Sequence, residues 1–291
     1  MPIYYTYALS ILNTHLYNGA QIVLNKSSVI TQDFWTSVQK HNVTNFGGVP
    51  YVYEMIDRLN LLPKQSGLLK HLTVAGGKLS EKLTLKMCNY CKAHGIKFYT
   101  MYGQTEATAR MLVLPWDNAF DKIGSAGILI QGGYIDLIDE QKNIVKSPAC
   151  VGEIVYHSKS VTMGYASSYE DLIKDDEFNG ILETGDLASR DSEGFFYIKG
   201  RKSNFVKIHG KRISLLDIEK GLVDIGIDAA CVQRDDFVYL FFVTAPKALE
   251  IIDSLMYDLG IPKRYYKTTA LQEIPRQSSG KISYANLAQL I

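Results

Sequence analysis

Apolar runs alternate with amphipathic stretches along the first hundred residues. The expected strands are residues 21–24, 45–49, 71–75 and 97–100, and the expected helices are residues 31–41, 51–60 and 80–94. In the last helix, Leu83, Met87 and Cys91 recur at i, i+4 and i+8, Ser80 stands at the N-cap and Gly95 closes the helix. Strands that alternate with helices are typical of βαβ units and a parallel sheet.

The pattern changes after residue 120. Between residues 122 and 199, short apolar runs are separated by turn-forming stretches, which predicts antiparallel and barrel-like β structure. A basic, turn-prone stretch at 200–204 follows. Beyond it we expect helices over 214–224 and 246–259 and strands over 231–233 and 237–244. The predicted fold class is α/β: a partial parallel α/β subdomain over 1–120, a β-rich subdomain over 121–200 and a small α+β domain over 201–291.

Glycine-bearing or polar turns follow the expected strands. Gly47-Gly48-Val49-Pro50 follows the second strand, Gly76-Gly77-Lys78 follows the third, and residues 101–106 follow the fourth. Ligands bind at the carboxyl ends of the strands in open parallel sheets, so these turns are expected to line one crevice. The alternative is that the glycines serve only to make the turns.

Composition narrows the class of protein. The 291 residues include 31 basic and 30 acidic ones, so the net charge of +1 gives no general attraction to nucleic acid or to an anionic membrane. With 46% apolar residues the chain can bury a sizeable core. Four cysteines do not make a disulfide scaffold, and a reduced, cytoplasmic setting is expected.

The first 25 residues contain no Asp, Glu, Lys or Arg. The lack of a basic start argues against a signal peptide, and polar interruptions argue against a membrane span. We interpret this stretch as a segment buried in a larger domain. In the isolated chain we expect part of it to be exposed and to drive self-association or binding of a partner subunit.

Four short motifs carry candidate chemistry. Thr105 and Glu106 could contact phosphate and Mg²⁺, although the same residues suit a helix N-cap and first turn. Asp186, in Thr-Gly-Asp-Leu, could accept ribose hydroxyls or only serve a turn. Arg201 opens a basic stretch that is either a phosphate clamp or a solvated loop. Lys281 follows Gly280, which lets one long cation project into a site.

Cys88 and Cys91 have the spacing of a metal or redox motif, with His94 three residues on. No second cysteine pair lies nearby, and Cys91 falls on the apolar stripe of its helix. Packing in the core is therefore the favoured interpretation.

The order and spacing of the motifs resemble the adenylate-forming enzymes, which include acyl-CoA and aryl-CoA synthetases, nonribosomal-peptide adenylation domains and luciferases. The matching segments are residues 102–106, 152–154, 160–165, 184–187, 200–213 with Glu219, and 275–281. Three departures stand out. No Ser/Thr/Gly-rich phosphate loop occurs upstream, Tyr5 stands where many members have His, and Ser203 stands at the usual hinge position. The resemblance therefore covers the C-terminal half to three-fifths of a full enzyme. Residues 1–200 would be part of its large AMP-binding domain and residues 201–291 its small mobile domain.

The resemblance implies a role for individual residues. Lys281, Thr105 and Glu106 would be catalytic, with Glu106 on Mg²⁺. The AMP or ATP site would comprise Gly76, Gly77, Tyr102, Gly103, Asp186 and Arg201, and the acid pocket would comprise Tyr5, Gly47, Val49 and Met101.

The implied activity is ATP-dependent conversion of a carboxylic acid to acyl-AMP, followed by transfer to a thiol such as CoA or a carrier protein. The alternatives are an AMP- or acyl-adenylate-binding module that depends on a partner, and a decayed pseudoenzyme. Residues 1–25 contain no Asp or Glu that could pair with the ammonium group of an α-amino acid. The substrate is therefore expected to be an aryl or aliphatic carboxylic acid.

Overall fold

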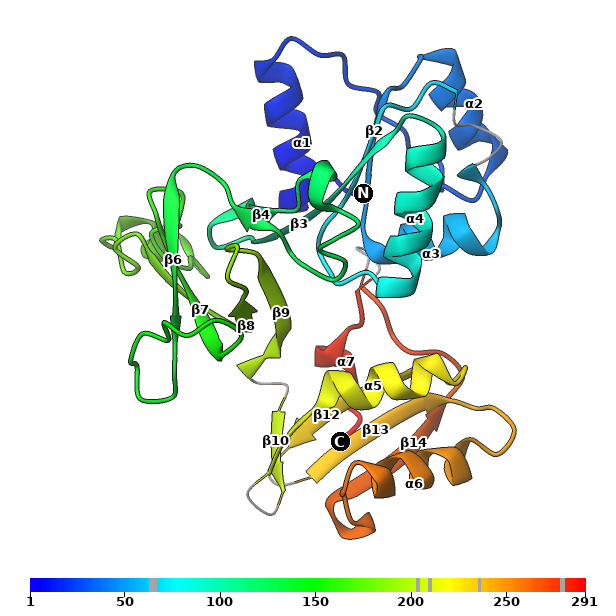
Figure 1. Ribbon diagram of the computed structural model, residues 1–291, viewed down its shortest axis with the longest axis vertical. Coiled ribbons are helices and arrows are strands. Elements are labelled where there is room, and N and C mark those ends of the chain that lie inside the picture. Colours follow the sequence, from blue (N-terminus) through cyan, green and yellow to red (C-terminus); the bar gives the residue numbers. More distant parts are fainter. Residues whose placement is uncertain (63–66, 203–204, 209–210, 235–236, 278–280) are drawn as a thin grey trace. The chain divides into compact units, whose positions relative to one another are not determined.

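The computed structural model describes the chain except for residues 63–66, 203–204, 209–210, 235–236 and 278–280 (Figure 1). The described chain divides into two compact units, Met1–Lys199 and Gly200–Ile291. None of the described helices is both long and apolar enough to cross a membrane.

The first unit is built on a mixed sheet. In the described chain its strand order is β1 (Asn45–Gly48), β2 (His71–Val74), β3 (Lys97–Gln104), β4 (Thr108–Val113) and β5 (Ile128–Leu129). β1, β2 and β3 are parallel, whereas β4 is antiparallel to both of its neighbours. α2 (Gln32–Lys40), α3 (Pro50–Arg58) and α4 (Glu81–Ala93) bury Trp35, Tyr53 and Met87 with Leu72 and Phe98 of the sheet. α1 (Thr6–Tyr17) packs on a separate cluster around Tyr7, and Figure 1 shows it across the strands from α4.

Periodicity predicted these helices well. α2, α3 and α4 lie within a few residues of their expected bounds, and the Ser80 hydroxyl accepts a hydrogen bond from the Leu83 amide at the start of α4. The strand expected at 21–24 is wrong, because these residues form no strand. A short apolar run is not sufficient evidence for a strand, since a strand also needs a neighbour to pair with.

The strand expected to end at residue 100 continues to Gln104. β3 then turns back into the antiparallel β4, so Thr105 and Glu106 lie at the tip of a hairpin and not at the start of a helix. Gly103 permits the tight hairpin, because a Cβ atom there would lie 2.2 Å from the Thr108 carbonyl oxygen. The strand therefore ends four residues later than expected, a turn follows it, and the alternative of a helix N-cap at Thr105 is wrong.

The second sheet of this unit has the order β6 (Gly133–Ile138), β7 (Val151–Ser158), β8 (Ile181–Arg190) and β9 (Phe196–Arg201) in the described chain. β7 is antiparallel to both β6 and β8, which agrees with the antiparallel structure expected after residue 120. The sheet is open, with β6 and β9 at its edges within the described residues, so the expected closure into a barrel is not seen.

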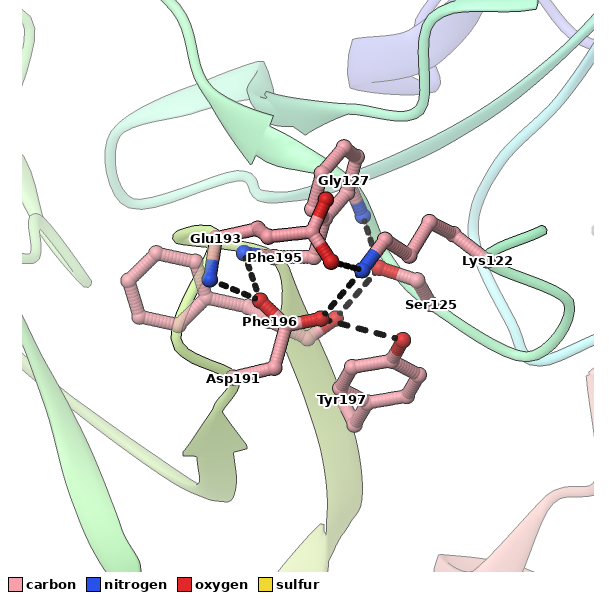
Figure 2. Close-up of polar contacts among 8 residues, drawn as sticks. All are labelled: Lys122, Ser125, Gly127, Asp191, Glu193, Phe195, Phe196 and Tyr197. Atoms are coloured by element: carbon pink, nitrogen blue, oxygen red, sulfur yellow. Dashed lines mark hydrogen bonds and ion pairs between the residues drawn. The ribbon is translucent and has the colours of Figure 1, made fainter. Parts of the chain in front are cut away.

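A polar network joins the segment between β4 and β5 to the turn between β8 and β9 (Figure 2). Lys122 Nζ lies 2.9 Å from Asp191 Oδ2 and also pairs with Glu193. These two hydrogen bonds raise the pKa of Lys122. Ser125 Oγ donates to the Phe196 carbonyl oxygen at 2.9 Å. The two sheets of the unit are thereby held in one arrangement.

The uncharged start of the chain is largely exposed. Of residues 1–25, all of which the structure describes, Tyr7 alone is buried. Tyr4, Leu16 and Tyr17 are 78%, 57% and 91% exposed, so their apolar surface faces outwards. This agrees with the expectation that part of the stretch is exposed in the isolated chain.

The second unit is a small α+β body. Its described elements are β10 (Phe205–Ile208), β11 (Lys211–Ser214), α5 (Leu215–Asp224), β12 (Ala229–Arg234), β13 (Phe237–Val243), α6 (Ala248–Asp258), β14 (Tyr266–Leu271) and α7 (Tyr284–Ala288). β13 lies between β12 and β14, antiparallel to β12 and parallel to β14. α5 and α6 bury Ile218 and Ile252 against this sheet. The Ser214 hydroxyl caps α5 by accepting from the Asp217 amide.

The cysteine pair of α4 lies in the apolar core. Cys88 and Cys91 are 1% and 0% exposed, and burial raises the pKa of their thiols to about 11 and about 12. His94 stacks on Tyr90 and hydrogen-bonds to its carbonyl oxygen through Nδ1. Both thiols act as small apolar groups, as the sequence indicated.

Candidate active site

A buried carboxylate is the centre of the site. Asp186, on β8, is 6% exposed, and its Oδ2 accepts two hydrogen bonds from β3. The Tyr102 hydroxyl donates at 2.7 Å and Gln104 Nε2 at 2.6 Å. Gln104 Nε2 also donates to the Thr184 carbonyl oxygen at 3.0 Å. Two donors on one oxygen fix the orientation of the carboxylate.

The backbone beneath Asp186 is shaped by a bulge. Gly185 has φ +68°, in the left-handed region that favours glycine. The Thr184 hydroxyl donates to the Ile154 carbonyl oxygen at 2.8 Å and accepts from the Asp186 amide at 3.1 Å. The Gly185 amide donates to Glu153 Oε1 at 3.2 Å, where the pairing of β7 and β8 shifts register. The Thr-Gly-Asp sequence is therefore a buried part of β8 and not a surface turn.

The tip of the β3–β4 hairpin presents a hydroxyl and a carboxylate. Thr105 is exposed, and its Oγ1 accepts from the Thr6 hydroxyl of α1 at 2.9 Å. Glu106 Oε1 accepts from the Tyr165 hydroxyl at 2.9 Å, and the Glu106 carbonyl oxygen accepts from the Thr162 amide at 2.8 Å. The segment around residues 162–165 thus supports the hairpin tip.

The glycine turns lie close to α1. A Cβ atom on Gly76, which has φ +83°, would lie 2.3 Å from the Tyr5 hydroxyl oxygen. A Cβ atom on Gly47 would lie 2.8 Å from the Tyr7 hydroxyl oxygen. Glycine is therefore needed at both positions, because these tyrosines approach the backbone closely. The other expected site residues here are Gly77, which follows Gly76, Met101, in the apolar cluster with Tyr7, and Val49, buried at the N-cap of α3.

Two expected site residues belong to the second unit. Arg201, at the end of β9, is exposed. Lys281 is exposed. The Gln277 amide donates to the Lys281 carbonyl oxygen and the Ser283 amide donates to the Pro275 carbonyl oxygen, both at 2.8 Å. Residues 278–280, Ser203 and 209–210 lie outside the described residues.

A second buried carboxylate contacts the first residue of α7. Glu219, on α5, is 8% exposed, and its Oε1 accepts from the Cys231 amide at 2.6 Å. The Tyr284 hydroxyl lies 3.1 and 3.0 Å from its two oxygens. Burial raises the pKa of Glu219 to about 7. The sequence analysis placed Glu219 in a motif but did not predict Tyr284 as its partner.

Gln104 is the site residue that the sequence analysis missed. It stands at a position between Gly103 and Thr105 that the motif leaves open. A usable signal was present, because Gln104 and Tyr102 are two residues apart in one strand and such residues share a face. The sequence does not show that this face lies against β8 of the second sheet, so its neighbour could not be predicted.

The comparison with protein families decides the assignment. Residues 1–166 match the family model described as AMP-binding enzyme. The chain belongs to the AMP-binding enzyme family. The resemblance inferred from its motifs is confirmed, and its Tyr102–Glu106 hairpin lies within the matched residues.

Relatives within this family include CoA ligases. The whole chain is 29% identical to the 2-succinylbenzoate–CoA ligases of Bacillus cereus and Bacillus thuringiensis over 305 residues. It spans 61% of the length of these relatives. The chain therefore matches part of a longer curated protein.

Solved structures share the fold. The O-succinylbenzoate coenzyme A synthetase of Bacillus subtilis in complex with AMP has a TM-score of 0.76 at 23% identity, covering 97% of this chain and 58% of that one. The amide bond synthetase McbA of Marinactinospora thermotolerans has a TM-score of 0.77 at 17% identity, covering 100% of this chain and 61% of that one. The Bacillus subtilis synthetase is also known in complex with ATP and a magnesium ion and with an acyl-adenylate intermediate.

Proposed function

We propose that the chain binds AMP and an acyl adenylate and provides the activating residues of an AMP-forming acid–thiol ligase. The observation that carries the proposal is the Asp186 carboxylate, held by Tyr102 and Gln104 beside the Thr105–Glu106 hairpin. Family membership and the acyl-adenylate complex of a protein with the same fold support the proposal.

In this proposal the nucleoside lies between the two sheets of the first unit. The Asp186 carboxylate accepts the two ribose hydroxyls, and Arg201 adds a cation on the ribose. The adenine lies between the Gly76-Gly77 backbone and the ring of Tyr102, with Gly103 allowing the close hairpin beside it. Because Asp186 is fixed before the nucleotide arrives, little orientational freedom is lost on binding.

In this proposal the phosphates of the nucleotide lie at the tip of the β3–β4 hairpin. The Thr105 hydroxyl donates to a phosphate oxygen, and Glu106 holds Mg²⁺. The residues present suit this ion, since Mg²⁺ takes hard oxygen ligands and is commonly held by one or two carboxylates together with substrate phosphates. When bound, the ion neutralises phosphate charge.

The proposed chemistry has two steps. A carboxylate oxygen of the acid attacks the α-phosphorus of ATP, a P–O bond forms, and the bond to pyrophosphate breaks. Lys281 bridges the carboxylate and the α-phosphate and stabilises the developing charge. In the second step the thiol of CoA or of a carrier protein loses its proton to solvent, its sulfur forms a C–S bond to the acyl carbon, and AMP leaves as the C–O bond breaks.

The acid is proposed to occupy the space beside α1. Tyr5, Gly47, Val49 and Met101 would line this region, where an apolar cluster around Tyr7 and Met101 lies beside the hydroxyls of Tyr5, Tyr7 and Thr73. The surroundings favour an aryl or aliphatic carboxylic acid.

A binding and an exchange assay test the proposal. Calorimetry with AMP should give a measurable heat that is lost in Asp186→Ala, and Arg190→Gln on the same strand serves as control. Acid-dependent exchange of pyrophosphate into ATP then separates an active ligase from a module that only binds the adenylate. Absence of AMP binding in a folded chain would refute both forms of the proposal.

A further inference from the structure

Lys281 lies in a part of the second unit where two stretches of backbone pair with each other. Residues 275–277 form the first arm and residues 281–283 the second arm of what we call the Lys281 segment. Two backbone hydrogen bonds of 2.8 Å and the antiparallel bridge between Arg276 and Ile282 join the arms. The backbone position of Lys281 therefore depends on what holds these arms.

Glu219 of α5 holds the end of the second arm through Tyr284. The Tyr284 hydroxyl, on the first residue of α7, lies 3.1 and 3.0 Å from the Oε1 and Oε2 atoms of Glu219. The carboxylate is itself oriented by the Cys231 amide of β12, which lies 2.6 Å from Oε1. Because Tyr284 directly follows Ser283, this contact fixes the point at which the second arm enters α7.

The contact between Glu219 and Tyr284 is the stronger of two contacts that hold the segment. On the first arm, Arg276 Nη2 lies 3.5 Å from Asp228 Oδ1, and these side chains are 34% and 46% exposed, so water screens the ion pair. Glu219 is 8% exposed, and Tyr284 is the donor to its Oε2 atom within the described chain. A buried acceptor that loses its donor is costly, so the position of Tyr284 is strongly specified.

We propose that Glu219 is a positioning residue for Lys281 and acts through Tyr284, which it holds at the end of the Lys281 segment. With the backbone fixed there, the lysine side chain has fewer positions to search before it bridges the acid and the α-phosphate. A misplacement of about 1 Å can slow a reaction about a hundredfold, so the contact has a measurable effect on the first step. The inference rests on the role proposed for Lys281 and adds the residues that set its position.

Hydrogen exchange of single amides in the full chain tests the inference without any need for turnover. Tyr284→Phe keeps the ring and removes the hydroxyl. The Gln277 and Ser283 amides, which join the two arms, should then exchange at least about tenfold faster, as expected for the loss of one hydrogen bond to a buried carboxylate. The amides of β13, the central strand of its sheet, should keep their exchange rates, because the second unit stays folded.

Two substitutions of Glu219 separate the hydrogen bond from packing. Glu219→Leu removes both oxygens and should accelerate exchange of the two amides as Tyr284→Phe does. Glu219→Gln keeps an oxygen for the Cys231 amide and offers an N–H to the Tyr284 hydroxyl, so exchange should stay within about threefold of the unaltered chain. Glu250→Gln, at an exposed position on α6, is the matched control and should change neither amide.

The two proposed half-reactions of the full chain give a second readout. Tyr284→Phe should slow acid-dependent exchange of pyrophosphate into ATP about tenfold and change the use of preformed acyl-AMP less than about twofold, because Lys281 is proposed to act in the first step. Equal losses in both half-reactions would overturn the positioning role.

Unchanged exchange of the Gln277 and Ser283 amides in Tyr284→Phe would overturn the inference and leave the proposed function standing. Equal acceleration of the β13 amides would also overturn it, because the contact would then serve the stability of the whole unit. Absence of pyrophosphate exchange in the unaltered chain would overturn the ligase form of the proposed function and with it any effect of Glu219 on catalysis. The amide exchange rates would still decide whether Glu219 holds the segment, so the two failures are distinguishable.

Discussion

The Asp186 clamp makes a quantitative prediction about ribose recognition. Asp186→Asn keeps the shape of the side chain and removes the negative charge that the ribose hydroxyls would meet. Hydrogen bonds to charged groups contribute about 1.5–3 kcal/mol, so losing the charge at one such contact should weaken AMP binding about tenfold or more. Calorimetry with AMP measures the loss, and circular dichroism checks that the variant is folded.

Gln104→Leu tests the support of that carboxylate. The substitution removes the 2.6 Å hydrogen bond to Asp186 and leaves the one from Tyr102, so the carboxylate gains rotational freedom. We expect AMP to bind about three- to tenfold more weakly, less than for Asp186→Asn, because the charge remains. Gln32→Leu, at an exposed position on α2, is the matched control.

A ligand that lacks both ribose hydroxyls identifies the contact. The unaltered chain should bind AMP at least about tenfold more tightly than 2′,3′-dideoxyadenosine monophosphate, and this ratio should fall towards one in Asp186→Asn. In Gln104→Leu the ratio should take an intermediate value. If Asp186→Asn weakens both nucleotides equally and the ratio persists, Asp186 acts on the fold of the site and not on the ribose.

Three further perturbations test other parts of the chain. In a catalytically competent protein, Lys281→Ala should slow acyl-AMP formation about 10²–10³-fold and affect use of preformed acyl-AMP far less; equal losses in both half-reactions would contradict its role. Since the pKa of Glu219 is raised to about 7, its protonated form stabilises the folded state most below about pH 4.5, and this contribution is lost as the pH rises through 7. Denaturant unfolding at pH 5.5 and 8 should therefore show a pH-dependent loss of stability that Glu219→Gln reduces; an unchanged slope would contradict the burial argument. Lys122→Met should lower the Tm measured by calorimetry, because Asp191 and Glu193 lose their shared cation; a Tm equal to that of Lys40→Met, an exposed lysine on α2, would show that the network is dispensable.

Local sequence patterns predicted what depends on local interactions. The helix over residues 81–93 was expected because its apolar spacing, the Ser80 cap and Gly95 act within a few residues of one another. The β3–β4 hairpin was missed, because Gly103 has the appearance of a turn residue and in fact lies inside a strand where two backbones approach. Whether a glycine ends a strand or continues it depends on the partner strand, which the local pattern does not contain.

The contacts within the candidate site join residues that are far apart in the sequence, so local patterns do not predict these contacts either. Motif order pointed to Tyr102, Thr105, Glu106 and Asp186, since these residue types suit nucleotide chemistry. The link from Gln104 to Asp186 spans 82 positions and joins two different sheets, so neither stretch indicates the other by itself. The same limit applies to Arg110 of β4, which donates to the hydroxyls of Ser10 and Thr14, 100 and 96 positions earlier in the chain.

Two glycines shape the surroundings of the buried Asp186 carboxylate, the proposed ribose acceptor. Gly185 gives β8 the left-handed residue that precedes Asp186, and Gly103 lets β3 and β4 approach closely below Tyr102 and Gln104. Burial of a carboxylate is costly, and here the donors from β3 offset part of that cost. A charged acceptor held in this manner interacts more strongly with hydroxyl donors than one that is free in water, because the surroundings screen it less. The burial of Asp186 and its proposed selectivity for ribose therefore have the same structural cause, which is the approach of β3 to β8.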